Sequence, residues 1–249
     1  MSSSNRFANL GYDDFRRLAV DESLSDFERI GFPDSYREGY EPAIFADILS
    51  KLTNLARDHA RVLDIGPGCS ELPRLLIKQS RQRSHQLLLV VSAEMLDRLP
   101  DEPFIVKDAA RYPDCQDLIT QNQGKLDAIL CYSVLQYVVN DSSVLTFVDT
   151  ALSLLAPGGQ MLIGDIPNVS KRKRFFASDT GVAFHKAFMK TDEPPELTFN
   201  RLESGQIDDA VVFALLQRAR AAGFDAYVLP QHPSLPMANR REDIFIVRP

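Results

Sequence analysis

The sequence predicts an α/β fold: a doubly wound, mostly parallel sheet of seven strands with an antiparallel last strand, an N-terminal helical cap and an insertion after strand 5. Short apolar runs alternate with amphipathic stretches from residue 41 to residue 164, as parallel strands with helical crossovers require. The last two apolar runs, 224–229 and 243–247, are joined by 13 residues with three prolines and no helical period. That pair must therefore be antiparallel.

The first strand–helix unit begins with a helix over 41–57, where apolar residues recur at helical spacing and Pro42 stands in the first turn. A short buried strand follows at 61–65 and is broken by the glycine turn Gly66-Pro67-Gly68. Ser70 is placed to cap the next helix, whose apolar face begins at Leu72.

The alternation continues along the chain. Residues 86–91 (QLLLVV) read as a strand covered on both faces. Further strands are predicted at 103–107, 125–131 and 160–164, and helices at 93–99, 114–121 and 141–155. A strong helix over 208–222 stops at Gly223, before the last two strands.

This reading divides the chain into four parts. Residues 1–40 are polar and aromatic-rich and form the N-terminal cap, and 41–165 form the Rossmann-like core. Residues 166–206 are longer than a typical connection and are predicted to be an inserted lid. Residues 207–249 complete the core sheet with a helix and two strands.

Composition limits the class of protein. The 249 residues carry a net charge of −6, which argues against a surface that grips nucleic acid throughout. The N-terminus has no apolar secretory core, and no run of 18 apolar residues occurs. Cys69, Cys115 and Cys131 are widely spaced, so neither disulfides nor a cysteine metal site is indicated. We expect a cytoplasmic protein without metal or membrane partner.

Ligands of such sheets bind at the carboxyl ends of the strands, and four polar or glycine-rich ends can be read: 64–70, 91–93, 107–109 and 131–133. The first lacks the dinucleotide fingerprint, because Glu71 replaces its last glycine, and it lacks a P-loop lysine. Asp64 is placed either to accept hydrogen bonds from turn amides or to hold a ligand's ammonium group. Asp108 is placed either to meet an adenine amino group or to cap a turn.

Five segments, VLDIGPGCS, SAEML, KDA, DAILCYSVLQYV and LAPGGQMLIGD, occur in the order and spacing of class I S-adenosylmethionine-dependent methyltransferases. The resemblance covers about residues 41–165, and the antiparallel tail agrees with it. SAEMLDRLPDEPF, ILCYSVLQYV and GDIPNVSKRKRFF also resemble methyltransferases associated with bacterial surface-sugar biosynthesis.

The resemblance implies S-adenosylmethionine as cofactor. Its implied binding residues are Asp64, Gly66, Pro67, Gly68, Ser70 and Ser92 for the amino-acid and ribose parts, Asp108 and Ala109 for the adenine, and Cys131, Tyr132 and Ser133 near the methionine. The family has an acidic residue for the ribose hydroxyls near position 91, where this chain has Val91. Ser92 and Glu94 are the neighbours that could replace it.

Methyl transfer from a sulfonium is an in-line displacement, and a base is needed only if the acceptor must lose its proton early. Candidates are Asp165, His185 and Tyr137. Each also has an ordinary structural interpretation, as a turn cap, a surface histidine and a core tyrosine. The basic run Lys171–Arg174 is either an anion site for a phosphate- or carboxylate-bearing acceptor or a solvated turn.

These observations predict an S-adenosylmethionine-dependent methyltransferase acting on a small molecule, by O-methyl transfer to a sugar or sugar-linked acceptor. The alternative, favoured by Val91, is a catalytically silent methyltransferase-like binding protein with a weakened cofactor site. Charge disfavours a nucleic-acid acceptor, and so does Cys131-Tyr-Ser-Val in place of an Asn/Asp-Pro-Pro-Tyr/Phe motif. A homo-oligomer is compatible with the sequence.

Overall fold

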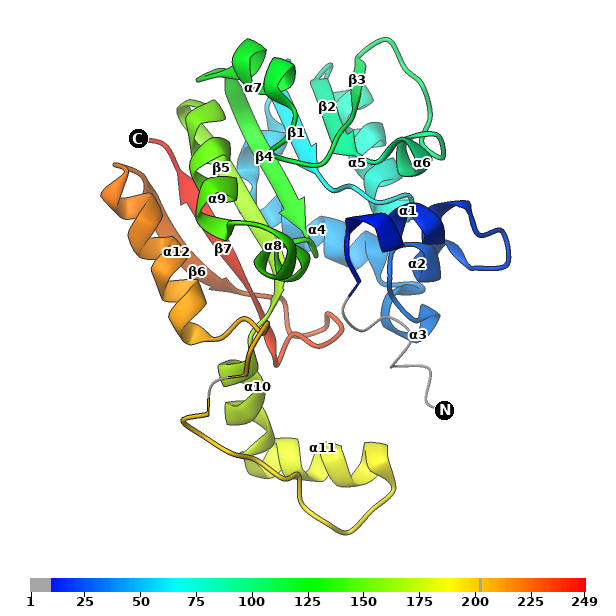
Figure 1. Ribbon diagram of the computed structural model, residues 1–249, viewed down its shortest axis with the longest axis vertical. Helices are drawn as coiled ribbons and strands as arrows, with labels where there is room; N and C mark the ends of the chain where they lie inside the picture. The colour runs from blue at the N-terminus through cyan, green and yellow to red at the C-terminus, as the bar shows by residue number, and fades with distance from the viewer. Residues whose placement is uncertain (1–9, 202) are drawn as a thin grey trace.

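The computed structural model describes residues 10–201 and 203–249. One seven-stranded sheet, in the order β3-β2-β1-β4-β5-β7-β6, runs through the molecule with helices on both faces (Figure 1). The strands are β1 Arg61–Ile65, β2 Gln86–Val91, β3 Ile105–Ala109, β4 Leu126–Tyr132, β5 Leu155–Pro167, β6 Asp225–Pro230 and β7 Arg241–Val247.

The pairing of the strands confirms the predicted sheet. β1 to β5 pair in parallel, and β7 lies antiparallel between β5 and β6. The fifth strand is longer than predicted, beginning at Leu155 instead of Gln160, because Leu155 already pairs with Leu126 of β4. Its far end bulges between Ile163 and Ile166, where the register with β7 shifts.

The predicted helices occur in the predicted order with somewhat different bounds, and the structure adds α8, which was not predicted. These helices are α4 Glu41–Lys51 with the 3₁₀ turn η2 Thr53–Ala56, α5 Glu71–Gln82, α6 Ala93–Leu96, α7 Gln116–Asn122, α8 Leu135–Asp141, α9 Val144–Leu154 and α12 Asp209–Ala221. The helix predicted over 141–155 begins only after Ser143, whose hydroxyl caps the Thr146 amide. No helix in the described residues is long and apolar enough to cross a membrane.

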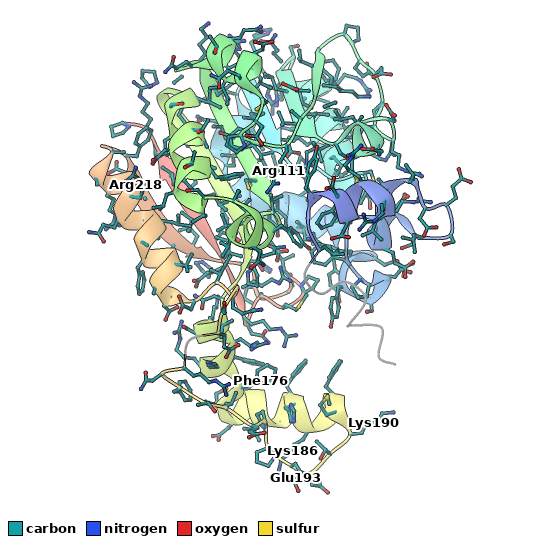
Figure 2. All side chains as sticks on the ribbon, in the orientation of Figure 1. Arg111, Phe176, Lys186, Lys190, Glu193 and Arg218 are labelled. Carbon is teal, nitrogen blue, oxygen red and sulfur yellow. The ribbon has the colours of Figure 1, made fainter. Side chains whose placement is uncertain are left out.

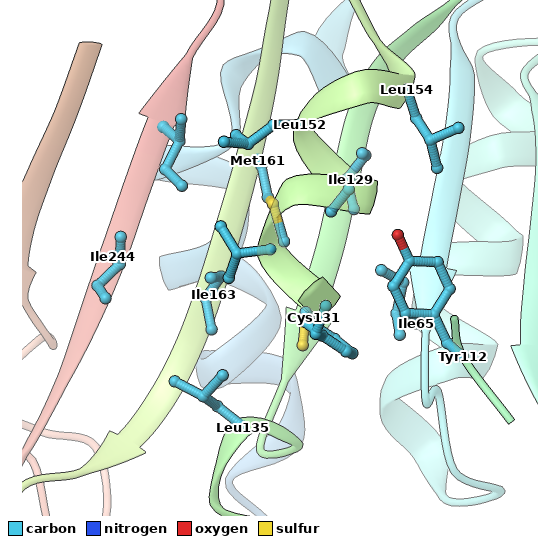
Figure 3. Packing of buried hydrophobic residues seen from close by; sticks show 14 of the residues in the cluster. Ile65, Tyr112, Ile129, Cys131, Leu135, Leu152, Leu154, Met161, Ile163 and Ile244 are labelled. Carbon is cyan, nitrogen blue, oxygen red and sulfur yellow. The ribbon is translucent and has the colours of Figure 1, made fainter. Parts of the chain in front are cut away.

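Alternate side chains of each central strand enter two separate cores, as the period of two in a strand requires. Leu63, Ile129, Cys131 and Met161 pack on the face covered by α9 and α12 (Figure 3). Val62, Leu87, Ala128 and Leu162 pack on the opposite face, with residues of α4 and α5. Burial on both faces explains why these strands read as nearly continuous apolar runs.

The N-terminal helices α1 Tyr12–Val20, α2 Asp26–Arg29 and α3 Asp34–Arg37 lie beside the carboxyl ends of the parallel strands (Figure 1). α1 packs on α6, and Arg16 of α1 forms an ion pair of 2.8 Å with Glu94 of α6. The Arg98 guanidinium also donates to the carbonyl of Ala19. These contacts attach the cap to the edge of the sheet where ligands bind in such folds.

Helices α10 Val169–Phe176 and α11 Asp179–Met189 form an arm that extends from the end of β5, away from the rest of the molecule (Figure 1). They occupy the first part of the predicted insertion. Figure 2 shows Phe176 and Lys186 on this arm and Lys190 and Glu193 in the segment that follows α11, whereas Arg111 lies on the main body.

Candidate functional site

A cleft lies at the carboxyl ends of β1, β2 and β4. Its empty space, including the part that is open to solvent, is about 1020 Å³. The strand order reverses direction between β1 and β4, and open α/β sheets bind ligands at such a point. Seven residues predicted for the cofactor line it: Gly66, Pro67, Gly68, Ser70, Ser92, Tyr132 and Ser133.

The glycine turn forms the floor of this cleft. Gly66 and Gly68 have φ values of +71° and +69°, a region that side chains rarely adopt. A Cβ atom on Gly66 would lie 2.7 Å from Val134 Cγ2, and one on Gly68 would lie 2.8 Å from Ile30 Cγ2. Backbone conformation and close packing therefore both require glycine at these two positions.

Four other residues predicted for the cofactor do not line the cleft: Asp64, Asp108, Ala109 and Cys131. Asp108 and Ala109 belong to the edge strand β3, and the wall is formed by the following residues Ala110 and Arg111. The Cys131 side chain is fully buried in the core beside Ile129 (Figure 3). Cys131 therefore belongs to the core and does not face the cleft.

Asp64 is buried directly before the glycine turn, with 4% of its surface exposed. No ion pair or hydrogen bond joins its carboxyl group to another described residue. Burial raises the pKa of Asp64 to about 8. The carboxyl group is therefore largely protonated at neutral pH until a cation approaches it.

A second buried carboxyl group lies on the other side of the turn. Glu41, at the start of α4, is 0% exposed and lines the cleft. Ser70 occupies the N-cap position of α5, as predicted, but its hydroxyl does not cap the helix. It donates instead to Glu41 Oε1 over 2.8 Å, while Glu41 Oε2 has no partner in the described structure.

The end of β2 supplies a small, uncharged wall. Val91 and Ser92 line the cleft, and the buried Ser92 hydroxyl has no hydrogen-bond partner among the described residues. Glu94 does not line the cleft, because Arg16 of α1 holds its carboxylate. The hydrogen bond from Arg16 lowers the pKa of Glu94 to about 2. Of the two neighbours that could replace the acid missing at Val91, only Ser92 is in place.

A buried polar network continues from the cleft toward β5 and β7. Arg37 of α3 donates to the Ser133 hydroxyl and, over 3.2 Å, to Asp165 Oδ2. Arg241 Nη1 lies 2.7 Å from the same oxygen. Gln231 Nε2 donates to Asp243 and to the Tyr132 hydroxyl, whereas Gln231 Oε1 is buried without a partner in the described residues.

This network borders a second, nearly filled cavity with a free volume of about 10 Å³. Phe32, Arg37 and Tyr132 line both cavities and form the wall between them. The remaining lining combines the apolar residues Tyr36, Ile44, Leu235, Pro236 and Met237 with Asp165 and Gln231.

The three predicted catalytic residues lie in three different places. Tyr137 lines the main cleft, with its ring edge-on to Phe15 at 4.7 Å, and burial raises its pKa. Asp165 lines the second cavity and is held by two guanidinium groups. His185 lies on the arm, where its ring is 6.1 Å from that of Phe176, and it lines neither cavity. The structure does not bring the three together.

The basic run of α10 is not an open anion site. Lys173 and Arg172 both pair with Glu203, and Arg174 pairs with Asp209. Lys171 donates to the carbonyl of Arg241. Among the described residues, no group of three or more histidine, cysteine, aspartate or glutamate side chains could hold a metal ion.

Sequence reasoning did not select the cleft residues that the cap and α4 contribute. They are Tyr12, Phe15, Ile30, Phe32, Arg37 and Glu41. Ligands are expected where parallel strands end, and none of these six residues lies at a strand end. That expectation therefore does not predict them. A usable signal is a charged residue in the first turn of an apolar helix, as Glu41 stands one turn before Ile44 and Phe45.

Comparison with known proteins places residues 36–191 in a family model described as a methyltransferase domain. The chain is 30% identical over 144 residues to the tRNA 5-carboxymethoxyuridine methyltransferase of Escherichia coli K12, covering 56% of this chain and 52% of that protein. It is 30% identical over 122 residues to the ubiquinone biosynthesis O-methyltransferase of Xylella fastidiosa M23, covering 48% and 46%. The chain thus matches about half the length of these curated relatives.

Among solved structures, the N-methyltransferase NodS from Bradyrhizobium japonicum WM9, in complex with S-adenosylhomocysteine, is similar with a TM-score of 0.56 and 15% identity. The similarity covers 96% of this chain and 98% of NodS. The CurJ carbon methyltransferase gives the same TM-score at 13% identity, covering 98% of this chain and 66% of CurJ. At these identities the likeness shows the fold alone.

Proposed function

We propose that this chain, which belongs to the methyltransferase domain family, is an S-adenosylmethionine-dependent methyltransferase, and that it methylates an acidic oxygen of a small molecule bound at the second cavity. The observation that carries this proposal is the shared wall of Phe32, Arg37 and Tyr132 between the two cavities. A cofactor in the larger cleft and an acceptor in the smaller one meet at that wall.

The cofactor supplies an electrophilic methyl group on a sulfonium. The residues present suit it, since the glycine turn leaves its backbone uncovered and two buried carboxyl groups without a cation flank the turn. Gly66, Gly68, Ser70 and Ser92 would hold it, with Ala110 and Arg111 beside its adenine. Most of the catalysis then comes from holding acceptor and methyl carbon in line.

The lining of the second cavity supports a small acceptor with an apolar body. Six apolar or aromatic side chains form its walls: Phe32, Tyr36, Ile44, Leu235, Pro236 and Met237. Its free volume is about 10 Å³, so these side chains must move apart to admit the acceptor. Gln231 Oε1 is buried there and accepts no hydrogen bond from the described residues. The amide is oriented with Nε2 toward Asp243 and the Tyr132 hydroxyl, because these oxygens accept its hydrogens. A hydroxyl on the acceptor would supply the missing donor.

The chemistry of the walls favours an oxygen that loses its proton readily, such as a phenol, an enol or a carboxylic acid. No histidine lines either cavity in the described residues. Asp165 is occupied by ion pairs with Arg37 and Arg241, and the raised pKa of Tyr137 keeps its phenol protonated. Asp165 therefore positions Arg37 and Ser133, and Tyr137 is a hydrogen-bond donor.

A sugar acceptor, as the sequence suggested, is less well matched. Sugar hydroxyls are weak acids that need a base early in the reaction, and several of them would face apolar walls without partners. The silent binding protein predicts no turnover with any acceptor.

The test has two stages. Calorimetry with S-adenosylhomocysteine first measures binding to the purified native chain. Release of S-adenosylhomocysteine is then followed with phenols, carboxylic acids, sugar nucleotides and RNA as acceptors. We expect turnover with acidic-oxygen small molecules, and Gln231→Leu should raise the KM for the acceptor without changing cofactor affinity. Turnover with sugar nucleotides or RNA alone would refute the proposed acceptor class.

A further inference from the structure

Glu41 is the buried charged group of the main cleft that the proposed reaction leaves without a role. The side chain is 0% exposed and lines the cleft. It belongs to the start of α4 and not to the glycine turn that follows β1. Ser70 fixes Oε1 over 2.8 Å. Its other oxygen, Oε2, is buried and has no hydrogen-bond partner in the described residues.

No ion pair compensates this carboxyl group in the described residues, and the charge of Arg37 only partly offsets its burial. The guanidinium that acts on it from nearby, Arg37, donates instead to Ser133 and Asp165. No ion pair joins Glu41 to any residue of the described ranges. Burial raises the pKa of Glu41, and it raises the pKa of Asp64 on the other side of the same turn to about 8.

Two buried acids without a cation, on either side of one ligand-binding turn, are costly to the protein alone. Their cost is relieved when a ligand brings positive charge and N–H donors to the turn. S-adenosylmethionine carries two cationic groups, an ammonium with three N–H donors and a sulfonium with none. Only the ammonium can satisfy an oxygen that lacks a donor.

We propose that Glu41 is a cofactor-binding residue, and that its Oε2 accepts a hydrogen bond from the ammonium group of the cofactor's methionine part. The carboxylate supplies a charge-assisted contact at the end of the ligand opposite the adenine, and Ser70 holds it in position. This contact offsets part of the ribose binding that the family obtains from an acid and that Val91 cannot supply.

Two other roles for Glu41 make different predictions. A contact with a ribose hydroxyl would persist in ligands that lack the amino acid. A role as base toward the acceptor is disfavoured by position, because Glu41 does not line the second cavity. The ligand that separates the two binding roles is 5′-methylthioadenosine, which retains adenine and ribose and lacks the ammonium and carboxylate.

The experiment compares the native chain with Glu41→Gln by calorimetry, using S-adenosylhomocysteine and 5′-methylthioadenosine. Glutamine keeps the shape and the acceptor for Ser70 and removes the charge. We expect Glu41→Gln to weaken S-adenosylhomocysteine by about 10- to 100-fold and to leave 5′-methylthioadenosine unchanged. Glu38→Gln makes the same chemical change at an exposed position nearby and should change neither affinity.

Proton release gives a second measurement that does not depend on turnover. A ligand that requires ionised Glu41 displaces its proton at any pH where the free protein still holds it, and burial widens that range by raising the pKa of this group. Binding of S-adenosylhomocysteine in buffers of different ionisation enthalpy should therefore release more protons from the native chain than from Glu41→Gln. Any proton released by Asp64 is released in both proteins, so it does not affect the difference between them.

Three results would overturn the proposal. The first is unchanged S-adenosylhomocysteine affinity in Glu41→Gln, and the second is equal weakening of both ligands, which would assign Glu41 to the ribose or to the shape of the turn. The third is identical proton release in the two proteins. Thermal unfolding of Glu41→Gln verifies folding, and loss of a buried charge should not lower its stability.

Discussion

Arg37 Nη2 lies 3.2 Å from Asp165 Oδ2, so that an ion pair joins the N-terminal cap to the end of β5 across 128 residues of sequence. Arg37 is 4% exposed and Asp165 is 6% exposed. Arg37 also stacks on Phe32, with its guanidinium carbon 4.3 Å from the ring centre. The pair therefore builds the wall between the two cavities and attaches the cap to the sheet.

Replacing one partner of this pair should be strongly destabilising. Arg37→Met leaves Asp165 with Arg241 alone, and breaking a buried pair in this way costs about 3 kcal/mol of the free energy of unfolding. Asp165→Asn keeps the left-handed backbone, with φ of +60°, that asparagine tolerates. The double variant should lose less stability than the sum of the two, because each single change already removes the pair.

Urea unfolding of the four proteins measures this coupling. Arg16→Met is the matched control, because Arg16 and Glu94 form an ion pair with exposed fractions of 49% and 24%. It should lose about 1 kcal/mol or less. Strictly additive losses for Arg37→Met and Asp165→Asn would show that the buried pair is not a unit.

Asp64 should make the protein less stable as pH rises. Its pKa is about 8 in the folded chain against an ordinary value of 3.8, so the folded state binds the proton more tightly than the unfolded state. The stabilisation is complete below the unfolded pKa and is lost as pH rises from about 4 toward 8. Each pH unit in that window costs up to about 1.4 kcal/mol.

Asp64→Asn removes this titration without changing the shape of the side chain. Its free energy of unfolding, measured in urea across that pH range, should decline less steeply than that of the native chain. The variant should be the more stable protein at the alkaline end of the window. Parallel curves would mean that Asp64 is ionised in the folded protein throughout.

The sequence predicted the sheet well because its signals are local. Runs such as 86–91 are buried on both faces, and the proline-rich segment after β6 excludes a helical crossover. The polar contacts of the site have no such signal. Ser70 reads as a helix cap, and only the folded chain brings its hydroxyl to Glu41, 29 residues earlier. Arg37 and Asp165 are still further apart, so their pairing depends on how the cap packs.

Gly66→Ala should disturb the cofactor site through both backbone and packing. Its φ of +71° is strained for alanine, and the added Cβ would lie 2.7 Å from Val134. Gly158→Ala separates the two effects, since Gly158 has φ of +73° with no atom within 4 Å of an added Cβ. We expect about 1 kcal/mol of lost stability at Gly158 and more at Gly66.

Calorimetry then separates stability from binding. S-adenosylhomocysteine affinity should fall at least about tenfold in Gly66→Ala and stay unchanged in Gly158→Ala, because Gly158 lies at the opposite end of β5 from the cleft. Equal affinities in the two variants would show that the turn tolerates a side chain and that its close approach to Val134 is unnecessary for the ligand.

Val91→Asp should strengthen cofactor binding. Val91 is the last residue of β2, half-buried and part of the cleft wall, so a carboxylate there faces the ligand without full desolvation. Hydrogen bonds from the ribose hydroxyls to that carboxylate should tighten S-adenosylhomocysteine by about tenfold or more. Val91→Asn, with the same shape and no charge, should gain less. If Val91→Asp binds more weakly than the native chain, the ribose does not lie against β2, and the Ser92 hydroxyl beside it would have to be assigned to another part of the ligand.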